Sequence, residues 1–199
     1  MNESYTRHFL EEAAELARGL PVATIDAMVD GLAAVRDGGG RLFILGVGGG
    51  AGHASHAVND FRKLCHLESY APTDNVSELT ARINDDGWET AYAAWLKGSR
   101  INGADAVLVF SVGGGSREHG VSTNLVAALD VARAVGAKIY GIVGKSDGET
   151  ARVADACVVV PAPAERRTPQ VEAFQAVVWH LIVSHPRLAA QAGKWESLE

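Results

Sequence analysis

The sequence predicts an α/β fold: a three-layer αβα sandwich with a central parallel sheet and an N-terminal helical extension. Short runs rich in Val, Ile and Leu alternate with segments whose apolar residues recur at helical spacing, and this alternation is typical of parallel sheets covered on both faces. Two of the apolar runs end in glycine turns that open into helices. With 199 residues and 47% apolar composition, the chain is long enough to bury a core. We therefore expect a single domain over residues 1–199.

The N-terminal segment is predicted to be helical. Apolar residues recur at helical spacing over residues 3–37, and Pro21 interrupts the pattern, which favours two helices. A run of three glycines from Gly38 ends the second helix. We expect residues 1–37 to pack on the domain and at an oligomer interface.

The remaining elements follow in βα order. The predicted strands lie at residues 41–45, 70–71, 106–110, 138–143 and 156–160. The predicted helices lie at residues 52–64, 75–82, 88–97, 122–135, 149–154 and 168–184. Ser77 is expected to bond back to local backbone N–H groups, and residues 84–87, Asn-Asp-Asp-Gly, are expected to form a turn. In a parallel sheet of this kind, ligands bind beyond the carboxyl ends of the strands, which is where both glycine turns lie.

Composition narrows the classes of function. A net charge of −6 disfavours a nucleic-acid partner. Cys65 and Cys157 are far apart, so neither a disulfide framework nor a CxxC metal site is indicated. The chain has acidic residues near its start where a secretory signal would be basic, and no apolar run of about 18 residues. We expect a cytoplasmic protein without a membrane partner.

Both glycine turns are candidate phosphate sites, because backbone N–H groups at a helix N-terminus attract anions. The candidate residues are Gly48, Gly49 and Gly50 in the first turn and Ser111, Gly113, Gly114, Ser116 and Ser122 in the second. Glycine after a strand also serves simply to permit positive φ, and Ser122 also fits a helix cap. The duplication favours a phosphorylated small molecule.

Several titratable side chains are candidates for chemistry. His56 and Asp60 share one helix face at i, i+4 spacing and could converge on a cation or a substrate, although a solvated helix face explains the pair better when it is taken alone. His180 lies in an apolar stretch and is expected to be largely surrounded by hydrocarbon, as a core histidine also would be. Glu172 lies eight residues earlier, about 12 Å along a helix, and is the least secure ligand. Asp85 could border the same mouth, or only form its turn.

In the order of these pieces, the chain resembles the sugar isomerase (SIS) domain, a flavodoxin-like fold, and most closely the phosphoheptose isomerases, which interconvert sedoheptulose 7-phosphate and a heptose 7-phosphate aldose. The resemblance runs from the N-terminal helices to about His185. It is carried by the turn at residues 46–50 with His56 and Asp60 after it, by Asn84 and Asp85, by the loop at residues 111–122, and by Glu172 and His180.

The resemblance implies a set of roles at these positions. It implies a zinc ion, or another divalent metal, at His56, Asp60, Glu172 and His180, with Asp60 and His180 as the catalytic acid/base pair. Substrate and phosphate would be bound by Gly48, Gly49, Gly50, Asp85, Ser111, Gly113, Gly114, Ser116, Ser122 and Glu172. It also implies a homotetramer with sites at subunit boundaries and a small phosphosugar as substrate.

The sequence departs from the family pattern at four positions. The first turn of the family usually reads GNGGS, whereas here Val47 and Gly50 replace the Asn and the Ser. Asp60 replaces the customary Glu, and Glu172 replaces the customary Gln. The phosphate loop, roughly STSGNS in the family, is longer here by about six residues. These departures indicate a divergent branch whose phosphate contacts depend more on backbone N–H groups.

The implied reaction is physically reasonable for these residues. Aldose–ketose isomerisation needs a base beside the carbonyl, an acid to return the proton, and positive charge near the developing enediolate. We hypothesise that Asp60 is the base, His180 its partner, and that a zinc-type ion polarises the carbonyl. Two alternatives stay open. One is a non-catalytic phosphosugar-binding or protein-interaction module of the replication-initiator-associating type, and the other is an isomerase for a different sugar phosphate.

Overall fold

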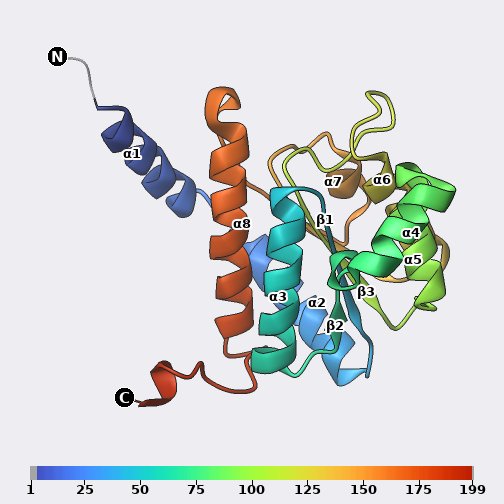
Figure 1. Ribbon diagram of the computed structural model, residues 1–199. Helices are drawn as coiled ribbons and strands as arrows, with labels where there is room; N and C mark the ends of the chain where they lie inside the picture. The colour runs from blue at the N-terminus through green and yellow to red at the C-terminus, as the bar shows by residue number, and fades with distance from the viewer. Residues whose placement is uncertain (1–3, 199) are drawn as a thin grey trace.

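A computed structural model describes residues 4–198, within which five strands form one parallel sheet in the order β2-β1-β3-β4-β5 (Figure 1). The strands are β1 (Leu42–Gly46), β2 (Ser69–Tyr70), β3 (Ala106–Ser111), β4 (Lys138–Val143) and β5 (Ala156–Val159). This order is that of flavodoxin-like folds, in which the chain changes direction across the sheet between β1 and β3. Leu42 pairs with Ala106 and Gly46 with Phe110, so the two strands end side by side. The predicted fold class is confirmed.

Helices cover both faces of the sheet. They are α1 (Tyr5–Arg18), α2 (Val22–Asp37), α3 (Gly49–Cys65), α4 (Val76–Asp86), α5 (Trp88–Gly98), α6 (Thr123–Ala134), α7 (Glu149–Val153) and α8 (Arg167–Ser184). Short 3₁₀ turns lie at Pro72–Asp74, Ala164–Arg166 and Glu196–Leu198. None of the helices described is long and apolar enough to cross a membrane.

The two faces of the sheet hold separate cores, because successive strand residues point to opposite sides. In β1, Leu42 and Ile44 pack in the core beneath α2, α3 and α8, whereas Phe43 and Leu45 pack in the core beneath α5 and α6. All of these side chains are buried. Helices α3 and α8 therefore cover the same face of the sheet. The two glycine turns lie at the carboxyl-end edge of the sheet, because they follow β1 and β3 (Figure 1).

The prediction of a turn at residues 84–87 is wrong. These residues continue α4 to Asp86, and the helix ends only at Gly87, whose φ of 85° is a conformation that glycine adopts without strain. The cap of this helix also differs from the expectation for Ser77, since the side chain of Asn75 accepts from the backbone N–H of Glu78. A side chain just before the first turn reaches these N–H groups better than one inside it.

Candidate functional site

The first glycine turn is shaped by close packing. A Cβ atom on Gly46 would lie 2.2 Å from the carbonyl oxygen of Gly50, and one on Gly50 would lie 2.5 Å from that of Phe110. Gly48 has a φ of 60° and open space around it. The start of α3 can therefore press against the ends of β1 and β3. Packing accounts for Gly46 and Gly50, and phosphate binding at Gly48, Gly49 and Gly50 stays a prediction.

The second turn uses most of its hydroxyl groups locally. The Ser111 hydroxyl accepts from the backbone N–H of Gly114 at 3.0 Å. Ser116 and Val121 exchange two backbone hydrogen bonds, which close the additional residues into a small loop, and the Ser116 hydroxyl accepts from the N–H of His119. The loop projects beyond the start of α6 (Figure 1).

Ser122 occupies the cap position of α6 without capping it. Its φ is 50°, and its side chain makes no capping hydrogen bond. The helix-cap interpretation of Ser122 is therefore wrong, because the left-handed backbone keeps the hydroxyl away from the first helical N–H groups. Arg117 anchors the loop to Asp130 and Glu149, and these carboxylates raise the pKa of the Arg117 guanidinium.

Three predicted site residues meet where α3 and α8 lie side by side. Asp60 Oδ2 is 3.5 Å from His56 Nε2 and 3.6 Å from His180 Nε2. The imidazole rings of His56 and His180 are 5.4 Å apart between centroids and nearly perpendicular. His56 and Asp60 come from successive turns of α3, as their spacing predicts, and α8 supplies His180 from 120 residues further along the chain.

Asp60 is the buried member of this group. The residue is only 7% exposed, and the indole N–H of Trp179 donates to its Oδ2 at 3.0 Å. The side-chain amide of Asn59 donates to Oδ1 at the same distance. Two hydrogen bonds thus hold the carboxylate so that Oδ2 faces both imidazoles.

His180 is exposed, contrary to expectation. Its side chain is 52% exposed, and that of His56 is 55% exposed. The neighbouring Trp179 takes the buried position instead. In a helix that is apolar on several sides, the sequence does not indicate which side faces the core.

A backbone carbonyl determines which nitrogen of His180 is available. Nδ1 lies 2.7 Å from the carbonyl oxygen of Ala176, and because this oxygen can only accept, Nδ1 carries the proton. In the neutral ring, Nε2 then has a lone pair directed toward the Asp60 carboxylate. Such a pair of acceptors is favourable only with a cation or a proton between them. A carbonyl behind the ligating imidazole is the usual outer support of a metal site.

The three residues fit a divalent metal. One ligand atom from each of His56, Asp60 and His180 lies within 4.8 Å of the other two. Two ligands of a tetrahedral zinc ion, each about 2.0–2.2 Å from it, lie about 3.3–3.6 Å apart, which matches both imidazole–carboxylate distances. Nitrogen and carboxylate donors of this kind are common zinc ligands.

The other predicted residues lie apart from this group. The Glu172 carboxylate lies against Gly49, where a Cβ atom would be 2.6 Å from its Oε1, so it borders the first glycine turn. It is absent from the metal-ligating group formed within the described residues. Asp85 is exposed on α4, where it accepts from the side chain of Asn84.

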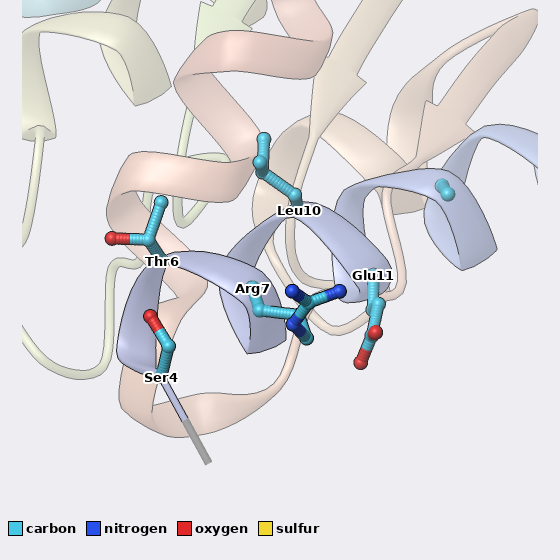
Figure 2. Close-up of a pocket in the computed structure, with 6 residues that line it drawn as sticks. Ser4, Thr6, Arg7, Leu10 and Glu11 are labelled. Atoms are coloured by element: carbon cyan, nitrogen blue, oxygen red, sulfur yellow. The ribbon is translucent and has the colours of Figure 1, made fainter.

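Two hollows were not anticipated. One, of about 460 Å³, is lined by α1 side chains that include Thr6, Arg7, Leu10 and Glu11 and none of the predicted site residues (Figure 2). The other, of about 710 Å³, borders His180 and runs toward the ends of α3 and α8. The sequence analysis also did not identify Trp179 as a residue of the site. The only sequence feature that could have indicated its role is that it immediately precedes His180.

Comparisons with known proteins find several phosphoheptose isomerases among the relatives of this chain. The lincomycin biosynthesis protein LmbN of Streptomyces lincolnensis is 30% identical over 194 residues, which cover 92% of this chain and 69% of that protein. The phosphoheptose isomerase of Rhodospirillum rubrum is 30% identical over 149 residues, which cover 72% of this chain and 74% of that protein. No protein-family model matches the chain.

Solved structures share the fold. The structure of a phosphoheptose isomerase from Francisella tularensis superposes with a TM-score of 0.77 at 20% identity, over 90% of this chain and 92% of that one. At this identity the likeness concerns the fold alone.

Proposed function

This chain belongs to the phosphoheptose isomerase family, and we propose that it is a phosphosugar aldose–ketose isomerase. The substrate we propose is sedoheptulose 7-phosphate, and the product is D-glycero-D-manno-heptose 7-phosphate. The observation that carries the proposal is the meeting of His56, Asp60 and His180 around one carboxylate oxygen. A module that only binds a phosphosugar has no need of this group.

Proton transfer is assigned to two of these residues. Asp60 is the base that removes the proton beside the carbonyl, since its carboxylate is held in one orientation by Trp179 and Asn59. His180 is its partner and acts through Nε2, because Nδ1 is committed to the Ala176 carbonyl. This one lone pair serves either the metal or a proton, so His56 and Asp60 would hold the metal while His180 transfers a proton. The low exposure of Asp60 keeps competing water away from the carboxylate.

The metal is part of the same proposal. A zinc ion held by His56, Asp60 and His180 would polarise the substrate carbonyl and stabilise the negative charge that develops on its oxygen. The donor set and its distances support this choice. Glu172 is proposed as a substrate contact at the first glycine turn, where the structure places it.

The phosphoryl group is assigned to the turn between β3 and α6. The backbone N–H groups of Gly113 and of the first residues of α6 follow the carboxyl end of β3, where anions bind in this kind of fold, whereas the Gly114 N–H already donates to the Ser111 hydroxyl. The Ser122 hydroxyl is not used to cap its helix. This supports a role for Ser122 in holding a phosphoryl oxygen.

We also propose a cytoplasmic homotetramer that buries the exposed side of the site. The imidazoles of His56 and His180 are about half exposed in one copy of the chain. Val177 and Leu181 are exposed on α8 near His180, and Tyr5 and Leu10 are exposed on α1. Exposed apolar side chains and a half-open site favour cover by another subunit.

The direct test is incubation of the purified, zinc-loaded chain with sedoheptulose 7-phosphate, followed by identification of the product. We expect an aldose heptose 7-phosphate, and we expect turnover to stop in chelator-treated protein and to return with zinc. Full turnover in demonstrably metal-free protein would exclude the metal from the reaction. Tight binding of the sugar phosphate without turnover would instead indicate a phosphosugar-binding module.

A further inference from the structure

His53 lies between the metal-ligating group and the glycine turns and has no role in the proposed reaction. On α3, Gly49, His53, His56 and Asp60 follow one another at spacings of four, three and four residues, so they share one face of the helix. The half-buried His53 ring packs against Phe110, at 6.2 Å between centroids, and against Trp179, at 5.1 Å. Phe110 immediately precedes Ser111 in the second turn.

A buried glutamine determines the tautomer of this imidazole. Gln175 is fully buried, and its Nε2 lies 3.2 Å from the carbonyl oxygen of Ile142. Because a carbonyl oxygen can only accept, the amide nitrogen of Gln175 faces Ile142 and its Oε1 faces His53. Oε1 lies 2.9 Å from His53 Nδ1, which must therefore donate.

The other ring nitrogen is left available as an acceptor. With the proton on Nδ1, Nε2 of the neutral imidazole carries a lone pair. Nδ1 faces the buried Gln175, so Nε2 lies across the ring from that residue, and the ring itself is only partly buried. Within residues 4–198, the structure gives Nε2 no hydrogen-bond partner.

The position of His53 suggests what this acceptor meets. His56 lies three residues on, about 4.5 Å along the helix, and Gly49 lies four residues back, about 6 Å in the other direction. His53 also packs against Phe110, which immediately precedes the turn assigned to the phosphoryl group. A phosphosugar with its carbonyl at the metal-ligating group and its phosphoryl group at that turn would bring its middle carbons near His53. Each of these carbons bears a hydroxyl group, which is the donor that the Nε2 lone pair lacks.

We propose that His53 is a further substrate-binding residue, whose Nε2 accepts a hydrogen bond from a hydroxyl group between the reacting carbonyl and the phosphoryl group. Gln175 is the positioning residue that holds the ring in the required tautomer. The inference rests on the proposed function, because it takes a phosphosugar as the occupant of the site.

Two substitutions separate binding from structure. In His53→Asn the amide nitrogen replaces Nδ1, so the bond to Gln175 is kept and the distal acceptor is lost. In His53→Gln the longer side chain carries an amide oxygen to the position of Nε2. His66→Asn makes the same chemical change at the exposed end of the same helix and serves as the control.

The experiment measures kcat and KM with sedoheptulose 7-phosphate, and calorimetric affinities for that sugar and for inorganic phosphate, on zinc-loaded proteins. We expect His53→Asn to weaken sugar-phosphate binding and to lower kcat/KM by about 3- to 10-fold, as loss of one hydrogen bond predicts. Its affinity for inorganic phosphate, its zinc content and its Tm should stay near those of the control. His53→Gln should recover part of the loss.

Two results would overturn the inference: a His53→Asn variant that equals the control toward the sugar phosphate, or one that loses phosphate affinity equally. A wild-type chain that binds the sugar without isomerising it would refute the proposed reaction, while the affinity of the variant would still decide the role of His53. A wild-type chain that does not bind the sugar would refute both.

Discussion

Replacing Asp60 by asparagine separates the role of this residue in the site from its role in the fold. The amide is nearly the same size as the carboxylate, and its oxygen can still accept the hydrogen bond from the Trp179 indole. Its NH2 group takes the place of Oδ1, where the exposed Asn59 amide can turn over and accept in place of donating. What it loses is the charge that faces both Nε2 atoms at 3.5 and 3.6 Å. We therefore expect the free energy of unfolding of metal-free Asp60→Asn to lie within about 1 kcal/mol of that of the metal-free wild type, because no buried charge is left unpaired.

Zinc should distinguish the two proteins clearly. At a free zinc concentration of 100 times Kd, binding stabilises the wild type by about 2.7 kcal/mol, which for a chain of this length raises Tm by about 5–11 °C. Loss of one ligand is expected to weaken binding at least as much as loss of an outer support, about 100-fold. The same zinc concentration then stabilises the variant by only about 0.4 kcal/mol.

The assay is thermal unfolding of both proteins after chelator treatment and again with added zinc. Asp26→Asn, which makes the same change at an exposed position of α2, is the matched control and should respond to zinc like the wild type. An equal zinc-induced rise of Tm in Asp60→Asn would show that Asp60 does not hold the metal. A large loss of stability in the metal-free variant would show that the carboxylate mainly supports the fold.

Three other substitutions or treatments test the fold. The Asp105 side chain is 2% exposed and accepts hydrogen bonds from Arg41 and Asn102. Asp105→Ala should therefore lower the free energy of unfolding, measured by chemical denaturation, by about 3 kcal/mol, and Asp37→Ala, at an exposed position, by under about 0.5 kcal/mol. Equal losses would show that the buried hydrogen bonds of Asp105 do not stabilise the fold. Gly50→Ala should destabilise the protein by about 1–3 kcal/mol, because its Cβ would press on the Phe110 carbonyl, whereas Gly52→Ala, with open space around it, should stabilise α3 by about 0.5–1 kcal/mol. Desolvation by burial raises the pKa of both cysteine thiols, Cys65 and Cys157, to about 12. At pH 8 about one molecule in ten thousand should then carry the thiolate at either position, whereas an ordinary cysteine would be about a quarter thiolate, so a thiol reagent should react slowly. Rapid labelling of the native protein would show that these pKa values are not raised.

The sequence was sufficient for the order of the elements. Strands rich in β-branched residues and helices with regular apolar spacing are local signals, and the parallel sheet follows from their alternation. The turn predicted at residues 84–87 is absent, and it was predicted because Asn and Asp are favoured in turns. A single glycine with positive φ decides where α4 ends, and the three residues before it stay helical.

Only part of the candidate site could be predicted from the sequence. The spacing of His56 and Asp60 places both on one helix face, and the resemblance to a family suggested that His180 joins them. The exposure of His180 could not be foreseen, because α8 also carries the exposed apolar residue Val177, so its apolar residues do not mark one buried face. The bond between His53 and Gln175 joins residues 122 positions apart, and no local pattern marks such a contact.

Aspartate in place of the glutamate customary in the family is compatible with this site. A carboxylate shorter by one methylene would fall about 1.5 Å short if α3 and α8 kept a separation suited to glutamate. Here Asp60 Oδ2 already lies 3.0 Å from the Trp179 indole nitrogen and 3.5–3.6 Å from both imidazoles. His56 is on the same helix as Asp60, and Trp179 and His180 are on α8. The shorter acid is thus matched by the way the two helices pack. Lengthening it in Asp60→Glu would push the carboxylate into Trp179 and the imidazoles, so restoring the family residue alone should weaken the metal site.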